Sequence, residues 1–277
     1  MGQISKQIQD RLPTRAKRAI QALRYYAGDR SAMRDARAVA LPDGFARIYH
    51  HHIRRSGGTS LNAAFKATGG ADFRDKQALL FARGWMVHGG RIFVAHNKFL
   101  IEKGHYFFAR SHSPAHELRL PRGTFTVTIL RDPVERVISH YNALLEWEKN
   151  GVPHPERPWL GDSFAAFLRT IPRAHLLRQL YTFSRDFDVE TARARLAQLD
   201  AVLLAERYAD GLAMLERRLG LDLALFREKA SAPIVAIDEG DRARLRALLE
   251  PEYALLAGVR DGGNVLASPA APAGAPA

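Results

Sequence analysis

The sequence predicts an α/β fold in which a central, mainly parallel β-sheet is flanked by helices. Strand-like and helix-like segments alternate along most of the chain, which is typical of a parallel sheet. Residues 125–131 (FTVTILR) are rich in β-branched and apolar side chains, which favour a buried strand. With 277 residues, 47% of them hydrophobic, the chain can bury a sizeable core.

The expected elements follow in chain order. Strands are expected over residues 46–53, 91–96, 106–111, 125–131 and 201–205, and helices over 59–68, 133–150, 163–171, 174–182, 190–199, 209–219 and 240–256. Pro133 suits the first turn of its helix, and Asp132 before it can cap that helix. A Pro- and Gly-rich break separates the helices on either side of residues 151–158.

Three regions are expected along the chain: a basic helical opening segment over 1–45, a main domain over 46–260 and a low-complexity tail over 261–277, which is expected to be disordered. The opening segment has two interpretations. It is either an amphipathic helix that touches a membrane face or a polyanion, or a helix docked on the main domain with a solvated basic face.

The composition limits which cellular location and which binding partners are expected. The chain has no cysteine, no apolar run of transmembrane length and no apolar region of a secretory signal, so a cytoplasmic location is expected, with peripheral membrane contact through the opening helix as an alternative. Lys plus Arg is 41 against 29 for Asp plus Glu, a formal charge of +12 that attracts anions such as nucleic acid, acidic lipid or a phosphorylated cofactor. No RNA-binding aromatic motif is present, so nucleic acid is not an expected partner.

A Gly pair between the first strand and the first helix of the main domain is the first functional signal. A strand, a Gly pair and a helix together present free backbone N–H groups to an anion, although the same pattern also forms ordinary tight turns. The loop is not a Walker A motif, because Gly58 stands where that motif has lysine. The residues expected to bind an anion here are Arg54, Arg55, Ser56, Gly57, Gly58, Thr59 and Ser60.

The second signal is the segment TILRDPVERVISHY over 128–141. Arg131 ends the strongest strand, and Ser139 lies about two helical turns further on. Because the carboxyl ends of parallel strands gather at one edge of a sheet, Arg131 is expected to face the Gly-pair loop. The alternative is that Arg-Asp-Pro marks only the start of a helix.

The two segments together resemble a known family. IRRSGGTSL is similar to the 5′-phosphosulfate loop of carbohydrate-type sulfotransferases that use PAPS (3′-phosphoadenosine-5′-phosphosulfate), and ILRDPVERVISHY resembles their 3′-phosphate motif. The heparan sulfate 2-O-sulfotransferases and bacterial family 2 sulfotransferases are of this type. Two weaker likenesses follow, LLAERYADGLAMLERRLGL around a glutamate that is buried in the family, here Glu206, and LEPEYALL near the C-terminus.

The resemblance implies a three-layer P-loop-type fold, with 46–260 as the sulfotransferase domain. It implies that residues 55 and 57–60 hold the 5′-phosphosulfate, and that Arg131 and Ser139 hold the 3′-phosphate that distinguishes PAPS from ATP. Where the family has Pro-Lys, this chain has Arg54-Arg55, so the catalytic lysine role falls to Arg55. Arginine can neutralise charge on the bridging oxygen but does not readily donate a proton.

Transfer of a sulfuryl group also requires a base for the acceptor hydroxyl. Histidine titrates near neutral pH, and His112, just after an apolar strand and in the place of the family's base-bearing segment, is the expected general base. A structural or substrate-contacting role for His112 is the alternative, and His88 and His96 are weaker candidates. His50, His51 and His52 lie on one strand, where neighbours face opposite sides, so no metal site is expected.

The expected function is therefore transfer of a sulfuryl group from PAPS to a hydroxyl of a carbohydrate or glycan-like acceptor, without a metal. The alternatives are a P-loop kinase-like enzyme that uses ATP and a non-enzymatic polyanion-binding protein.

Overall fold

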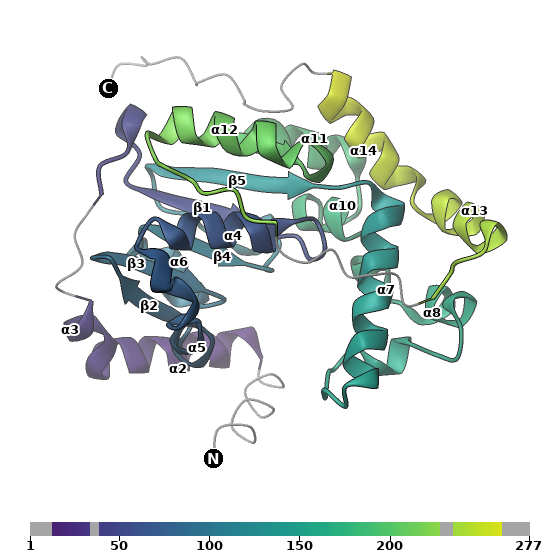
Figure 1. Cartoon of the computed structure of the whole chain (residues 1–277), viewed down its shortest axis with the longest axis horizontal. Coiled ribbons are helices and arrows are strands. Elements are labelled where there is room, and N and C mark those ends of the chain that lie inside the picture. The colour runs from purple at the N-terminus through teal and green to yellow at the C-terminus, as the bar shows by residue number, and fades with distance from the viewer. Residues whose placement is uncertain (1–12, 34–38, 228–234, 262–277) are drawn as a thin grey trace. The chain divides into compact units, whose positions relative to one another are not determined.

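A computed structural model describes residues 13–33, 39–227 and 235–261 of the chain. It has the predicted α/β fold, in which a six-stranded, mostly parallel central sheet is accompanied by helices (Figure 1). The strands are β1 (Arg47–His51), β2 (Trp85–His88), β3 (Arg91–Ala95), β4 (Phe108–Ser111), β5 (Thr124–Leu130) and β6 (Ala201–Leu204).

The strand order is β2-β3-β4-β1-β5-β6. β3 pairs with β4 and β5 with β6 in parallel, whereas β2 runs antiparallel to β3 with Trp85 opposite Val94. A strand over 85–88 is absent from the sequence-based expectation. Gly89 and Gly90 close this hairpin, both with positive φ, which glycine adopts without strain.

The chain divides into two compact units, and each is described by itself. Unit 1 takes in the described part of residues 1–50 together with 65–111 and 118–125. Unit 2 takes in 51–64, 112–117 and the described part of 126–277.

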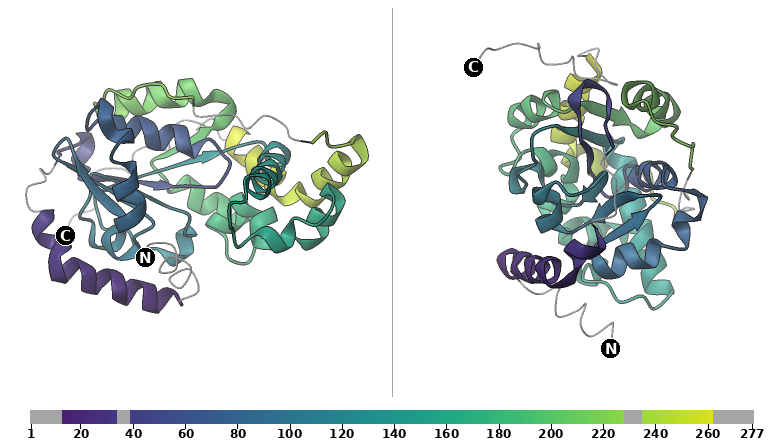
Figure 2. Two further views of the ribbon diagram at one scale, coloured as in Figure 1. Left: turned by 60° about the horizontal axis from the view of Figure 1, so that its bottom comes forward. Right: turned by 90° about the vertical axis from the view of Figure 1, so that its left-hand side faces the viewer.

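Unit 1 contains β2, β3 and β4 with short helices around them. These are α2 (Thr14–Arg24), the π-helical turn η1 (Tyr25–Asp29), α3 (Arg30–Ala32), η2 (Pro42–Gly44), η3 (Ala71–Arg74), α5 (Gln77–Arg83) and α6 (Lys98–Lys103). Tyr25 packs at 5.5 Å between ring centroids on Phe99 of α6 and donates to or accepts from His105 at 2.8 Å. The part of the opening segment that the structure describes is therefore docked on this unit (Figure 2). Residues 1–12 lie outside the described residues.

Unit 2 carries most of the helices. After α4 (Gly58–Ala67), whose first seven residues belong to it, come η4 (Ala115–Glu117), α7 (Pro133–Lys149), η5 (Arg157–Trp159), α8 (Phe164–Thr170), α9 (Arg173–Leu176), α10 (Arg178–Phe183), α11 (Val189–Ala197), η6 (Ala205–Arg207), α12 (Tyr208–Leu219), α13 (Glu239–Leu248) and α14 (Glu250–Asp261). α13 contacts α7, α8 and α14, and α12 contacts β6 (Figures 1 and 2). The core of the unit joins β5, α7, α8, α10 and α14 through side chains such as Leu130, Val137, Phe167, Phe183 and Leu256.

The helix expected nearest the C-terminus is divided in the structure. The single helix expected over 240–256 is two helices that meet at Leu249 and Glu250, because Pro251 has no N–H to continue the first helix. The start of α7 is as predicted: Asp132 accepts a hydrogen bond from the N–H of Glu135 at 3.0 Å, and Pro133 is the first helical residue. The tail over 262–277 lies outside the described residues.

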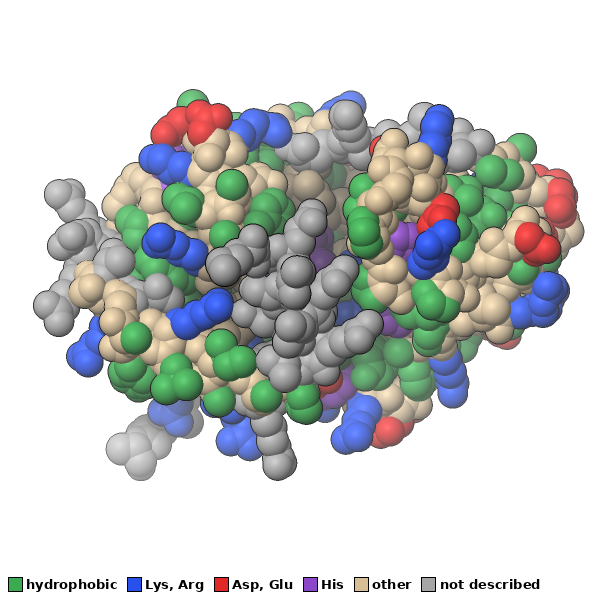
Figure 3. Space-filling model, turned by 90° about the horizontal axis from the view of Figure 1, so that it is seen from below, with side chains coloured by type: hydrophobic (Ala, Val, Ile, Leu, Met, Phe, Trp, Pro, Cys, Tyr) green, Lys and Arg blue, Asp and Glu red, His purple; other side chains and the backbone are tan. Residues whose placement is uncertain are grey.

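The positive charge is dispersed over the face drawn in Figure 3. Lys and Arg side chains stand singly or in small groups there, among hydrophobic and neutral surface, and acidic side chains lie beside some of them. On that face the described side chains do not form one continuous basic patch.

Candidate functional site

The Gly-pair loop lies in unit 2, between the end of β1 and the start of α4. Residues 54–57 form a turn, and α4 begins at Gly58. Arg55 and Gly57 both have left-handed backbone conformations, with φ of 67° and 85°. An added Cβ at Gly57 would meet only the Cβ of Ala205, at 3.7 Å, so glycine is favoured there by its backbone angles and not by lack of space. A left-handed arginine carries strain, of the kind that folded proteins retain at functional turns.

Ser56 provides a second sign that the loop is built for a ligand. Its side chain is fully buried, and its hydroxyl has no hydrogen-bond partner among the described residues. Beside it begins α4, whose first N–H groups have no partner within the helix. Ser60 is buried and its N–H bonds to the carbonyl of Gly57 at 3.1 Å, whereas Thr59 is exposed. A buried donor next to a helix N-terminus suits an anionic oxygen.

The structure brings this loop together with the Arg-Asp-Pro segment. The Nε of Arg55 donates to the hydroxyl of Ser139 at 3.1 Å, and Nη1 of Arg131 donates to the carbonyl of Arg55 at 3.1 Å. Burial and the neighbouring Arg131 lower the pKa of Arg55. Two guanidinium groups and a hydroxyl thus meet beside the turn, an arrangement that would bind a doubly charged phosphate group.

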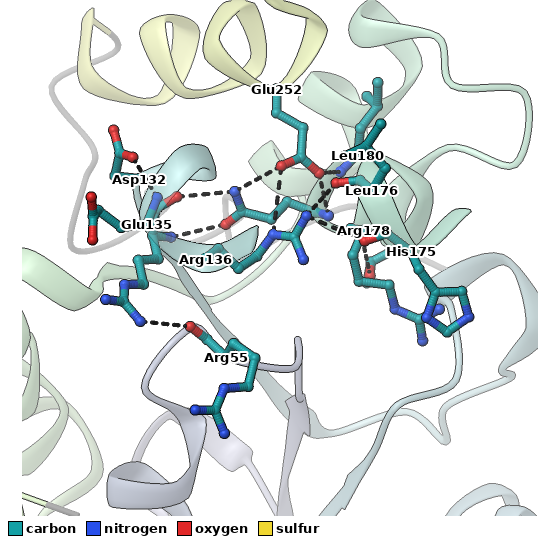
Figure 4. A network of polar contacts seen from close by, with 12 residues as sticks. Arg55, Asp132, Glu135, Arg136, His175, Leu176, Arg178, Leu180 and Glu252 are labelled. Atoms are coloured by element: carbon teal, nitrogen blue, oxygen red, sulfur yellow. Dashed lines mark hydrogen bonds and ion pairs between the residues drawn. The ribbon is translucent and has the colours of Figure 1, made fainter. Parts of the chain in front are cut away.

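Arg131, the residue directly after β5, is held in place by side chains. The amide of Gln179 accepts from the N–H of Arg131 at 2.8 Å and donates to its carbonyl at 3.0 Å. Glu252 in turn accepts from the backbone N–H of Gln179 at 2.6 Å and from its amide at 3.2 Å, and also lies 3.7 Å from Nε of Arg136 (Figure 4). Both Glu252 and Arg136 are buried. This chain of contacts fixes the backbone of Arg131.

Glu206 is an exposed residue, not the buried glutamate that the sequence led us to expect. It lies in η6, at the end of β6, and accepts from the N–H of Asp132 at 2.8 Å. The fully buried glutamate is Glu252, from the LEPEYALL segment. Its neighbour Tyr253 donates to Asp132 at 3.0 Å, so both glutamate-bearing segments contact the Arg-Asp-Pro segment.

His112 follows the end of β4 and is linked to the loop through Arg54. The Nε of Arg54 donates to Nδ1 of His112 at 3.3 Å, and a guanidinium N–H of Arg178 donates to the His112 carbonyl. The ring of His52 lies 4.7 Å from that of His112. Because Nδ1 accepts from Arg54, the neutral imidazole of His112 carries its proton on Nε2.

Arg54 also forms an ion pair with Glu156, a residue of the Pro- and Gly-rich break. Glu156 is buried, and its other carboxylate oxygen lies 3.5 Å from Nε2 of His140 on α7. Burial and the nearby Arg136 and Arg54 lower the pKa of His140 to about 2. Burial, Arg178 and Arg54 likewise lower the pKa of His175, on α9, to about 4.

The other histidines that the sequence singled out contact mainly structural groups. His50 packs near Phe108, and His51 near Phe183, where burial lowers its pKa to about 4. In unit 1, His88 bonds through Nε2 to the carbonyl of Gly70 at 3.0 Å. His96, also in unit 1, lies with Nε2 3.1 Å from Nη1 of Arg110.

Several residues of the site were not singled out from the sequence. Gln179 carried a usable signal, because it is a polar residue on the same face of α10 as the apolar Leu180 and Phe183. No sequence signal marked Glu156 as a site residue, since an acidic residue between two prolines is typical of an exposed loop. Arg178 and His175 were likewise indistinguishable from surface residues of a helix.

No protein-family model matches the chain, and no curated protein matches it either. Among the described residues, every helix is too short or too polar to cross a membrane.

Proposed function

We propose that this chain is a PAPS-dependent sulfotransferase that moves a sulfuryl group to a hydroxyl of a carbohydrate or glycan-like acceptor. One observation carries the proposal: the Gly-pair turn meets Arg131 and Ser139 through two contacts of 3.1 Å made by Arg55. The two segments that resemble the family's 5′- and 3′-phosphate motifs are therefore neighbours. An absent cysteine suits a reducing compartment, and the cytoplasm is the proposed location.

The loop and the Arg-Asp-Pro segment would divide the donor between them. The fully buried hydroxyl of Ser56 and the first N–H groups of α4 fit the 5′-phosphosulfate, together with Gly57, Gly58, Thr59 and Ser60. Arg131 and Ser139 fit the 3′-phosphate, a group that ATP lacks. Arg55 touches Ser139 through its side chain and Arg131 through its carbonyl, so it would lie between the two phosphate sites.

In the proposed reaction the acceptor O–H loses its proton to a base while its oxygen forms the new O–S bond. The bond between sulfur and the bridging oxygen of PAPS breaks, and its electrons leave with 3′-phosphoadenosine 5′-phosphate (PAP). His112 is the proposed base. Since Arg54 donates to its Nδ1, His112 accepts a proton there only after Arg54 turns away. The phosphosulfate is an anion that would attract Arg54 from His112.

The donor class is tested by thermal stabilisation with PAP, AMP and ATP. At equal concentration, a ligand that binds only the native state raises the melting temperature more the more tightly it binds. We expect the largest shift with PAP, and an ATP preference would refute the proposal in favour of a kinase-like enzyme. Equal shifts from all three ligands, or from none, would also refute it.

Arg131→Ala tests the 3′-phosphate assignment. A hydrogen bond to a charged group contributes about 1.5–3 kcal/mol, so PAP affinity should fall by about 10- to 100-fold while AMP affinity changes little. Arg207→Ala is the matched control, because Arg207 is an exposed arginine paired with Asp210. Unchanged selectivity for PAP over AMP in Arg131→Ala would refute the role of Arg131.

His112→Ala tests the base. It should bind PAP as tightly as the wild type but lose transfer from labelled PAPS to a panel of sugar acceptors, by about 100-fold or more. His116→Ala, a partly buried histidine of the same short segment, should keep its activity. Full activity in His112→Ala would show that another group removes the proton.

A further inference from the structure

His140, Glu156 and His175 bring three metal-ligand atoms together inside unit 2. One atom from each side chain lies within 4.8 Å of the other two. The three residues come from separate segments, α7, the residue before η5, and α9. His140 and Glu156 are buried, and His175 is partly buried with its ring 4.4 Å from that of Trp159.

Two atoms of these side chains are buried without hydrogen-bond partners among the described residues. Nε2 of His140 and Oε2 of Glu156 have none among the described residues, and they lie 3.5 Å apart. A buried polar atom that lacks a hydrogen bond destabilises a fold by about 1–3 kcal/mol, so such a pair calls for an explanation. Two ligands at about 2.1 Å from a tetrahedral zinc ion are separated by about 3.4 Å, close to the observed spacing.

We propose that His140, Glu156 and His175 bind a zinc ion. Two imidazoles and one carboxylate are a ligand set found at zinc sites that keep a fourth position for water or substrate. The same set disfavours Mg²⁺ and Ca²⁺, which prefer oxygen ligands.

The nearby arginines are the main argument against a cation here, and two of them, Arg54 and Arg136, have acidic partners. Arg54 pairs with Oε1 of Glu156, which leaves Oε2 for the metal, and Arg136 lies 3.7 Å from Glu252. Hydrogen bonding of a ligating carboxylate to a further side chain is a common arrangement around metal ions. The remaining positive charge of Arg178 should weaken binding, which is a reason to expect zinc, with its strong bonds to imidazole, rather than Mn²⁺ or Fe²⁺.

Zinc at this position would tie the segment around Glu156 to α7 and α9. Since Glu156 holds Arg54, which touches His112, the ion would also fix the side of the loop that faces His112. The proposal does not depend on sulfuryl transfer, and the failure of either leaves the other standing.

The test is metal titration of the full chain after treatment with a chelator. Co²⁺, a coloured substitute for Zn²⁺, should bind one equivalent per chain with the visible spectrum of a four-coordinate ion, and Zn²⁺ should displace it. Zn²⁺ should also raise the melting temperature, and Mg²⁺ should not. Absence of saturable uptake of one equivalent by the wild-type protein would overturn the proposal without any variant.

Variants identify the ligands. Loss of a residue that only supports a metal ligand costs about 10- to 100-fold in affinity, so His140→Ala and His175→Ala should each lose at least about 100-fold. His116→Ala, a partly buried histidine of the same unit outside the cluster, should bind as the wild type does. Where an alanine variant fails to fold, His140→Gln and His175→Asn serve instead. Wild-type affinity in the His140 and His175 variants, or an equal loss in His116→Ala, would overturn the assignment.

Discussion

Glu252→Gln removes one negative charge from the centre of unit 2 and leaves the shape of the side chain nearly unchanged. Glu252 is fully buried and accepts hydrogen bonds from the N–H groups of Gln179 and Leu180, at 2.6 and 3.2 Å. It also lies 3.7 Å from the guanidinium of Arg136, which is 2% exposed. Glutamine would leave Arg136 without its acidic partner and would bring an NH₂ group against another donor, the amide of Gln179.

The expected loss of folding stability is large for a single isosteric substitution. Removing one partner of a buried ion pair costs about 3–5 kcal/mol, because the remaining charge stays buried and uncompensated. For a chain of this size each kcal/mol corresponds to about 2–4 °C, so the melting temperature should fall on the order of 10 °C. Because Gln179 also holds the backbone of Arg131, PAP binding by the folded fraction should weaken as well.

Thermal unfolding followed by circular dichroism measures this change. Glu250→Gln is the matched control, since Glu250 is an exposed glutamate at the start of the same helix and its loss should change stability by no more than about 0.5 kcal/mol. A loss below about 1 kcal/mol for Glu252→Gln, or equal losses in the two variants, would refute the argument that Glu252 compensates the charge of Arg136.

Three further predictions concern stability. The folded-state pKa of His51, about 4, lies below the ordinary 6.5, so its contribution is present above pH 6.5 and is lost as the pH falls toward 4. At 1.36 kcal/mol per pH unit below 6.5, the loss of stability amounts to about 2 kcal/mol by pH 5. The melting temperature of His51→Gln should therefore drop less than that of the wild type between pH 7.5 and pH 5, and an equal drop in the two proteins would contradict the prediction. Gly57→Ala should lower the free energy of unfolding in urea by about 1–2 kcal/mol, because alanine is strained at a φ of 85°. Steric contact adds nothing, since the nearest atom, in Ala205, is 3.7 Å from the new Cβ, and an unchanged free energy of unfolding would argue against the left-handed turn. Gly211→Ala places a Cβ 2.7 Å from Cγ of the buried Leu203 and should cost about 1–3 kcal/mol in the same assay, and a neutral effect would show that α12 can move away from β6.

Local sequence patterns were sufficient for most of the sheet. The β-branched run that forms β5 and the Asp-Pro cap of α7 depend on neighbours within a few residues, so their position could be read directly. β2 could not, because WMVH is short and its pairing with β3 depends on the hairpin turn at Gly89 and Gly90. Likewise, α6 begins at the Asn97 cap, which accepts from the N–H of Leu100 at 3.1 Å, within a stretch that shows no helical periodicity.

The candidate site, too, could be predicted only in part from the sequence. The Gly-pair turn lies within one short segment, and Arg131 and Ser139 lie within another, so the residue spacing in each could be recognised. Glu206 was expected to be buried but is exposed, whereas Glu252 is buried. Burial of a charged side chain depends on which distant partner it meets, here a backbone N–H for Glu206 and Arg136 for Glu252. Sequence position gives no information on such a partner.

The two adjacent arginines of the loop point to different parts of the site, and this bears on which of them replaces the family's lysine. Arg55 donates to Ser139, on the side proposed for the 3′-phosphate, whereas Arg54 donates to His112, on the side proposed for the acceptor. In an in-line transfer the leaving oxygen lies opposite the acceptor, so Arg55 remains the arginine proposed to stabilise it. Arg54, in contrast, occupies Nδ1 of His112, the atom that the proposed base would need. Glu156 resolves this conflict in the structure, because it gives Arg54 a second, acidic partner. Arg54 could therefore leave His112 without losing its compensating charge, so the proposed base would become available once the proposed anionic donor is bound.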